Sequence, residues 1–176
     1  ETVRVRENGR LADHEVELEY THRGPAFRNK DGQLCSIQTA GYELFNFLGQ
    51  MLEMSRAQSV PEFKAALGAL EQTALNCMCA DSKGNIYCVN LGRLARRSGK
   101  YDWQNAVPGW EPETEWGDIH PLEDLAQIEN PDSGFLQNCN VHAWTMTTDC
   151  PIREEDYPDW FYICLFYTSP SPRDLS

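Results

Sequence analysis

The sequence has no run of about 20 apolar residues, so it offers no candidate for a membrane-spanning helix. It also lacks an initiator methionine and a signal peptide, and we therefore expect a piece of a longer chain whose localisation signals lie elsewhere. Basic residues are few, 15 against 27 acidic ones, which gives a formal net charge of −12. Phosphate backbones and anionic lipids need a basic face, so nucleic acid and membrane surfaces are disfavoured as partners.

Cysteine pairs of the Cys-x-x-Cys type are absent, although the chain has seven cysteines. The cysteine spacing therefore suits neither a zinc ribbon nor a redox motif. Cys77 and Cys79 lie on one face of a predicted strand, where we expect them to pack as small apolar groups. A disulfide is compatible with the pattern, but the spacing specifies none.

What the sequence does contain is typical of a folded α+β protein, with 41% hydrophobic residues. Asn8-Gly9 predicts a hairpin turn between a strand at 2–6 and a return strand at 15–20. A second turn at 29–32 precedes a strand at 34–38. Two further strands within 74–91 flank a tight Asp-x-x-Gly-Asn turn.

Two helices are predicted between these groups of strands. The first has an apolar stripe, which we expect to face a core and which is formed by Leu44, Phe47, Leu48 and Met51. The second begins with a capping box, Ser59 followed by Glu62, and continues with a second apolar face. That face consists of Phe63, Ala66, Leu67 and Leu70.

Residues 98–129 form a long connection rich in tryptophan, proline and acidic residues. Loops of this length usually have a function or wrap the body of a fold. We interpret Trp103, Trp110 and Trp116 as side chains that pack the loop onto the protein, with a pocket wall as the alternative.

Residues 130–140 have the sequence Asn-Pro-Asp-Ser-Gly-Phe-Leu-Gln-Asn-Cys-Asn. Turn formers come first, then an apolar pair, then three amide side chains within four positions. In a strand, Asn138 and Asn140 would point to the same face. Such amides can cap a turn or a sheet edge. An amide at a strand end can also donate a hydrogen bond to the negative oxygen of an acyl-transfer intermediate.

This segment resembles the oxyanion-hole motif of the penicillin acylase (penicillin amidase) family of N-terminal-nucleophile hydrolases, Asn-Pro-x-Ser-Gly-Phe-Leu-x-Asn-x-Asn. Residues 76–86 resemble the family's Asn-x-x-x-Ala-Asp-x-x-Gly-Asn-Ile. Residues 92–97 resemble its Gly-x-x-Pro-x-Arg, with Ala95 in place of the proline and Arg97 kept. The resemblance covers about residues 14–161, with the motifs in the family's order.

The resemblance implies a partial αββα sandwich and an amidase that cleaves N-acyl substrates with a serine exposed by self-cleavage. That serine is expected upstream of this segment, so the segment alone is expected to be inactive. Asn140 would donate to the oxyanion hole, with Asn138 near the site. Arg97 is either a buried structural guanidinium near the site or a solvated surface residue.

The expected partners are a small-molecule N-acyl amide and the remaining parts of the parent chain, which matures into α and β chains. We expect no cofactor and no metal site within this segment, since no calcium-loop spacing is present. By resemblance, the full-length protein can hold a structural calcium and is expected in the periplasm or outside the cell. The acyl group stays open among penicillins, acyl-homoserine lactones and other N-acyl compounds.

Two features fall outside this interpretation. The turn at 81–87 also resembles the blade turns of a β-propeller, which makes a binding module the alternative, although two helices do not suit that fold. Residues 164–174 resemble a translated sequencing adapter. We therefore expect the acylase-like domain to occupy residues 1–163 and the tail, 164–176, to be non-native, disordered and without function.

Overall fold

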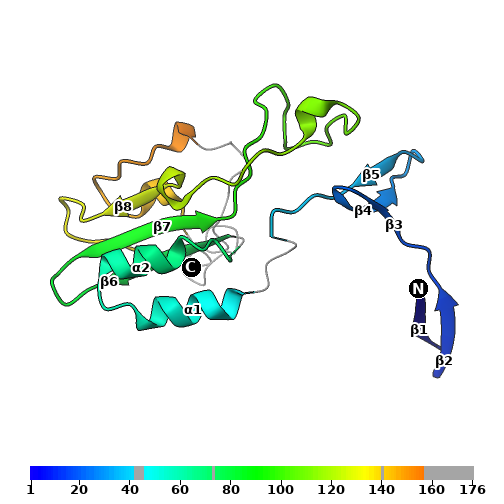
Figure 1. Cartoon of the computed structure of the whole chain (residues 1–176), viewed down its shortest axis with the longest axis horizontal. Helices are drawn as coiled ribbons and strands as arrows, with labels where there is room; N and C mark the ends of the chain where they lie inside the picture. The colour runs from blue at the N-terminus through cyan, green and yellow to red at the C-terminus, as the bar shows by residue number, and fades with distance from the viewer. Residues whose placement is uncertain (42–45, 73, 140, 157–176) are drawn as a thin grey trace, which may run out of the picture. The chain divides into compact units, whose positions relative to one another are not determined.

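The chain folds into two compact units in the computed structural model, which describes residues 1–41, 46–72, 74–139 and 141–156 (Figure 1). The first unit consists of residues 1–40 and 98–114, and the second of 41–97 and 115–176. Helices and antiparallel sheets occur together, which confirms the predicted α+β class.

The first unit begins with a hairpin of β1 (Thr2–Glu7) and β2 (Arg10–Glu15). Asn8 and Gly9 have positive φ angles of 50° and 81°, as the predicted tight turn requires. The return strand predicted at 15–20 is wrong, because a two-residue turn pairs Glu7 directly with Arg10 and starts the strand at once. The alternating apolar residues of the range 15–20 therefore do not set the register of β1 and β2.

A three-stranded antiparallel sheet follows in the first unit, with β3 (Glu19–Thr21), β4 (Gly24–Arg28) and β5 (Leu34–Ser36) in that order. The predicted turn before β5 is confirmed, and the Asn29 side chain accepts hydrogen bonds from two backbone N–H groups within it. The strand predicted at 34–38 is present but shorter.

The loop part of the first unit includes the 3-10 helix η1 (Pro112–Thr114). The Trp103 indole N–H donates to the Ser98 carbonyl at 2.7 Å, so this side chain links two positions within the connection. Trp110 is 85% exposed, and its predicted packing role is wrong for the part of the chain that the structure describes.

The second unit is built on an antiparallel sheet in the order β6 (Ala74–Ala80), β7 (Ile86–Gly92) and β8 (Gln127–Glu129). The turn between β6 and β7 is confirmed: Asp81 Oδ1 accepts from two backbone N–H groups, at 2.9 Å and 3.0 Å. The strand β8, within the long connection, was not predicted. It follows the 3-10 helix η2 (Leu122–Asp124).

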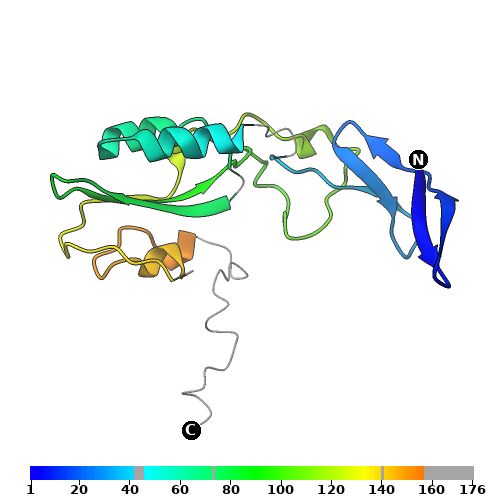
Figure 2. The same cartoon turned by 90° about the horizontal axis from the view of Figure 1, so that it is seen from below.

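The sheet of the second unit is covered on both faces (Figure 2). Tyr87, Val89 and Leu91 of β7 pack with Val60 and Leu67 of the helical layer. On the opposite face, a second cluster is formed by Cys88, Ile128, Val141, Ala143 and Met146. The layers are therefore helices, sheet and the irregular segments 130–139 and 141–156, the second of which includes the 3-10 helices η3 (Ala143–Thr145) and η4 (Glu154–Asp156).

The helical layer consists of α1 (Phe47–Arg56) and α2 (Val60–Leu67). The start of α2 confirms the capping box: Ser59 Oγ accepts from the Glu62 backbone N–H at 3.4 Å. The Glu62 carboxylate accepts from the Gln58 backbone N–H at 2.8 Å, one residue earlier than in the standard motif.

The face of α1 that packs inward differs from the prediction. Phe47, Leu48 and Met51 are 41%, 77% and 44% exposed, and Leu44 lies outside the described residues. The buried residue of α1 is Gln50, which is 2% exposed and hydrogen-bonded to the end of α2 and to Glu71. A polar side chain that satisfies three backbone groups decides which face of α1 meets α2.

The described cysteines are all free thiols, and the two most buried are Cys77 and Cys88. Burial raises the pKa of Cys77 to about 11 and that of Cys88 to about 12, so both stay protonated at neutral pH. Cys77 packs in the helix-side cluster, with Cys79 against it, which confirms that they serve as small apolar groups. Across the described ranges, every helix is too short or too polar to cross a membrane.

Candidate functional site

The segment that carries the predicted site residues is fixed to the sheet at its start. Asn130 has a positive φ of 47°, and its backbone N–H donates to the Ile86 carbonyl at 3.0 Å. Its side chain accepts from the Ile86 N–H at 2.9 Å and donates to Asn85 Oδ1 at 3.1 Å. Asparagine tolerates the left-handed conformation and supplies both side-chain contacts, so the chain leaves the sheet at a defined angle.

The turn that follows is held from the other side by residues 147–149. The Gly134 N–H donates to the Pro131 carbonyl at 2.9 Å, and the Ser133 N–H donates to Asp149 Oδ2 at 3.1 Å. The Thr147 hydroxyl contacts Ser133 Oγ and donates to Asp149 Oδ1 at 3.0 Å. Hydrogen bonds from the Ser133 side chain, then its backbone, and from Thr147 lower the pKa of Asp149, which therefore stays ionised.

Gln137, three residues before the predicted oxyanion donor, makes two further hydrogen bonds to residues 145 and 146. Its backbone N–H donates to the Met146 carbonyl at 2.9 Å, and its side-chain amide donates to the Thr145 carbonyl at 2.8 Å. Residues 135–139 do not form a strand, so the condition under which Asn138 and Asn140 would share one face is not met. Asn140 lies outside the described residues, and its role as the oxyanion donor stays a prediction.

Asn138 is joined to the sheet by a chain of amide side chains. Asn76 in β6 and Asn90 in β7 are directly opposite each other in the register. The Asn90 amide donates to Asn76 Oδ1 at 2.9 Å, and the Asn76 amide donates to Asn138 Oδ1 at 3.3 Å. The sequence analysis did not assign a role to Asn76 or Asn90, since their contact with residue 138 depends on the strand register.

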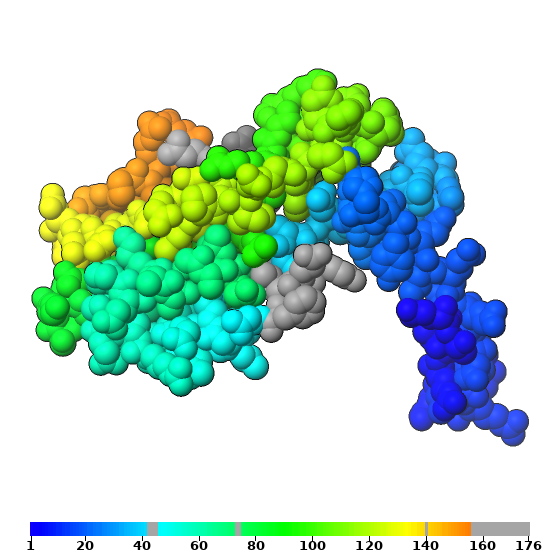
Figure 3. All heavy atoms as spheres, in the orientation of Figure 1, coloured from blue at the N-terminus to red at the C-terminus, as the bar shows by residue number. Residues whose placement is uncertain are grey.

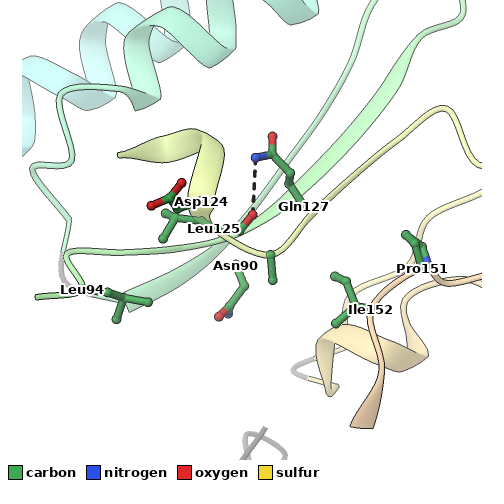
Figure 4. A pocket seen from close by; sticks show the side chains of 8 residues that line it. Asn90, Leu94, Asp124, Leu125, Gln127, Pro151 and Ile152 are labelled. Atoms are coloured by element: carbon green, nitrogen blue, oxygen red, sulfur yellow. Dashed lines mark hydrogen bonds between the residues drawn. The ribbon is translucent and has the colours of Figure 1, made fainter. Parts of the chain in front are cut away.

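An open hollow of about 490 Å³ lies beside Asn90 (Figure 4). Its lining is mixed, with apolar side chains next to two amides and one carboxylate. The lining residues are Asn90, Leu94, Asp124, Leu125, Ala126, Gln127, Pro151 and Ile152. The hollow therefore has room for a small group that is partly apolar.

The carboxylate of this hollow is held by two side chains, His120 and Arg96. Asp124 Oδ2 lies 2.8 Å from His120 Nδ1 and accepts from Arg96 at 2.7 Å. Hydrogen bonds from His120, then Arg96, and the charge of Arg96 lower the pKa of Asp124, so the carboxylate is charged at neutral pH. It contributes a fixed negative charge next to the apolar lining.

Arg97, predicted near the site, is exposed, and its guanidinium lies 5.9 Å from the centre of the Trp116 ring. This distance suits a cation–π contact and gives Trp116 a packing role in the second unit. Of the two alternatives for Arg97, the exposed surface residue fits the structure, and its place near the site stays a prediction. Within residues 1–41, 46–72, 74–139 and 141–156, no group of three or more metal-binding side chains is arranged to hold an ion.

Two comparisons place this geometry among known proteins. The model of the penicillin amidase family matches residues 1–174. A thermostable penicillin G acylase from Alcaligenes faecalis has a similar structure, with a TM-score of 0.70 and 24% sequence identity. The match covers 85% of this chain and 27% of that one, so the chain spans about a quarter of the length of this structural relative.

The family match and the fold do not support the alternative of a β-propeller module. The two packed helices and the short separate sheets are consistent with the acylase-like fold instead. The chain belongs to the penicillin amidase family.

Proposed function

We propose that the full-length protein hydrolyses the amide bond of N-acyl compounds and that this chain supplies Asn140 as a donor to the oxyanion hole. Family membership supports the reaction class. The observation that supports the assignment of the donor most directly is the attachment of the chain on both sides of position 140. Asn138 is hydrogen-bonded to Asn76, and Val141 is buried in the cluster beneath the sheet.

The proposed reaction uses a serine at a newly formed amino terminus in another part of the protein. Its hydroxyl attacks the amide carbonyl while its own α-amino group takes up the proton. The carbonyl oxygen becomes negatively charged in the tetrahedral intermediate, and the amine then leaves. Water hydrolyses the acyl-enzyme, so the products are a carboxylate and an amine.

An asparagine suits this step because its amide is neutral and stays a donor at every pH used for assay. A donor of this kind stabilises the transition state by about 3 kcal/mol when it is already in place before the charge develops. The hydrogen bonds at Ser133, Gln137 and Asn138 support such preorganisation, since they fix the backbone that leads to position 140.

The proposed partners are a small-molecule N-acyl amide and the remaining α and β parts of the parent protein. The hollow beside Asn90 is a candidate for part of the substrate site, but it does not specify an acyl group. We propose that the reaction needs no cofactor and that the protein acts in the periplasm or outside the cell, as the family resemblance implies. A structural calcium in the full-length protein stays a prediction from the family resemblance, and we assign no ligand to it in this chain.

The test is Asn140→Ala in the full-length enzyme, with turnover measured on chromogenic N-acyl p-nitroanilides that carry aliphatic or aromatic acyl groups. We expect kcat to fall about 10²–10³-fold, because one oxyanion donor is lost. Asn105→Ala is the matched control, since it removes an exposed amide that donates to Asp102 at 2.7 Å in the first unit. Undiminished kcat in Asn140→Ala would contradict the proposal.

A further inference from the structure

We propose that the outer edge of β6, the edge that faces away from β7, pairs with a β-strand from a part of the full-length protein outside this chain. This partner strand would extend the sheet of the second unit. The chain spans about a quarter of the length of its structural relative, so most of a protein of that length lies outside it. The inference uses family membership and does not depend on the proposed reaction.

The hydrogen bonds of β7 show which of its backbone groups face each neighbouring strand. The Ile86 carbonyl accepts from the Asn130 N–H at 3.0 Å, on the side of β8. The Asn90 N–H donates to the Ala126 carbonyl at 2.9 Å on the same side. Because backbone groups alternate in direction along a strand, the even-numbered residues of β7 bond towards β8 and the odd-numbered ones towards β6.

The register of β6 and β7 then identifies the backbone groups at the outer edge of β6. The odd-numbered residues of β6 lie opposite the odd-numbered residues of β7 and therefore bond to that strand. The even-numbered residues direct their N–H and carbonyl groups away from β7, and they include Asn76, Met78 and Ala80. Among the residues that the structure describes, these backbone groups at the outer edge have no hydrogen-bond partner.

The strand β6 lacks the features that usually protect the edge of a sheet. Charged residues, proline, a bulge or a short length keep an edge strand from pairing with another strand. In contrast, β6 has seven residues, contains neither a charged residue nor a proline, and pairs with β7 in unbroken register. The opposite edge of the sheet is protected, because β8 has three residues, includes Glu129 and has Pro131 two residues after it. The outer edge of β6 is therefore the one that suits a further strand.

Helix α1 provides an apolar surface for the same partner strand. It packs against α2, which covers β6 and β7, and Figure 1 shows α1 on the far side of β6 from β7. Phe47 and Met51 are exposed and lie about one helical turn apart, next to the direction of Met54, which packs in the helix-side cluster. Leu75, on the helix side of β6, is 47% exposed. A strand paired with β6 would lie beside these side chains, so we expect apolar residues on its helix side.

Hydrogen exchange of the full-length protein, resolved to single residues by electron-transfer fragmentation, tests the pairing. Cys77 and Cys79 are the internal reference, because their N–H groups bond to β7. We expect the N–H groups of Asn76 and Met78 to be protected like the reference, with exchange at least about 100-fold slower than in an unpaired strand. Fast exchange at Asn76 and Met78 beside slow exchange at the reference would overturn the inference. Protection that rises with protein concentration would also overturn it, since it would indicate pairing with a second copy.

A proline variant tests whether the protection comes from strand pairing. Met78→Pro removes an N–H that β7 does not use, and Met78→Ala is the matched control, which shortens the same side chain and keeps the N–H. In the full-length protein, we expect exchange at Asn76 and Ala80 to be about tenfold or more faster in Met78→Pro than in Met78→Ala. Equal exchange in the two variants would overturn the inference. The wild-type measurement decides the question if Met78→Pro does not fold.

Discussion

Gln50 provides the sharpest test of how the helical layer is held together. Its amide donates to the carbonyls of Ala66 and Leu67, both at 3.0 Å, and its Oε1 accepts from the Glu71 N–H at 3.1 Å. The first two contacts satisfy carbonyls at the end of α2 that have no partner inside the helix. Since the residue is 2% exposed, water cannot replace these contacts.

Gln50→Leu keeps the side-chain volume and removes all three hydrogen bonds. At about 1 kcal/mol for each bond, with up to about 1 kcal/mol regained from the apolar side chain, we expect the free energy of unfolding to fall by about 2–3 kcal/mol. Chemical denaturation of the 176-residue chain, followed by circular dichroism, measures this difference.

The matched control is Gln58→Leu, the same substitution at an exposed position. Gln58 donates through one side-chain contact, to the Arg56 carbonyl at 2.9 Å. We expect its effect to stay within about 0.5 kcal/mol. If Gln50→Leu were as stable as the wild type, the polar contact would not decide how α1 packs against α2.

Three further predictions follow from other contacts. Gly24→Ala should destabilise the β3–β5 sheet by more than about 2 kcal/mol, because φ is +136° and a Cβ would lie 2.4 Å from the Ile37 carbonyl oxygen. Hydrogen exchange of the sheet amides measures this loss of stability, and protection equal to that of the wild type would contradict the prediction. The pKa of Asp149 is lowered in the folded state, so its stabilising contribution is present above the ordinary value of 3.8 and is lost as pH falls through the lower folded pKa. Asp149→Asn should therefore reduce the loss of stability on acid titration. An acid unfolding profile equal to that of the wild type would refute this. In the native chain at pH 8, maleimide should label exposed Cys139 well before Cys88, whose buried thiol has its pKa raised to about 12, and equal labelling rates by mass spectrometry would exclude that burial.

The elements that sequence analysis predicted correctly are those whose signals are local. The β6–β7 hairpin is specified by its turn, in which Asp81 binds the backbone of the next few residues. The start of α2 is specified by Ser59 and Glu62, three residues apart. In each case, a side chain binds backbone groups a few residues away, so the local sequence is enough to predict the element.

The errors have a common cause in contacts between distant residues. Periodicity identified α1 as amphipathic, but the buried face is decided by Gln50 and its partners 16–21 residues away. The amide chain from Asn90 to Asn138 depends on the β6–β7 register and on where the segment after β8 crosses the sheet. The motif at 130–140 predicts the site segment, but its spacing does not indicate which strand residues contact it.

The central claim is that position 140 supplies a preorganised donor to the oxyanion. A crystal structure of the full-length enzyme with a serine-bound transition-state analogue, such as a boronate or a sulfonyl adduct, tests it most directly. We predict that the side-chain nitrogen of Asn140 lies about 2.7–3.1 Å from the oxygen that represents the oxyanion. A side chain that points away from that oxygen, with another group in its place, would contradict the claim.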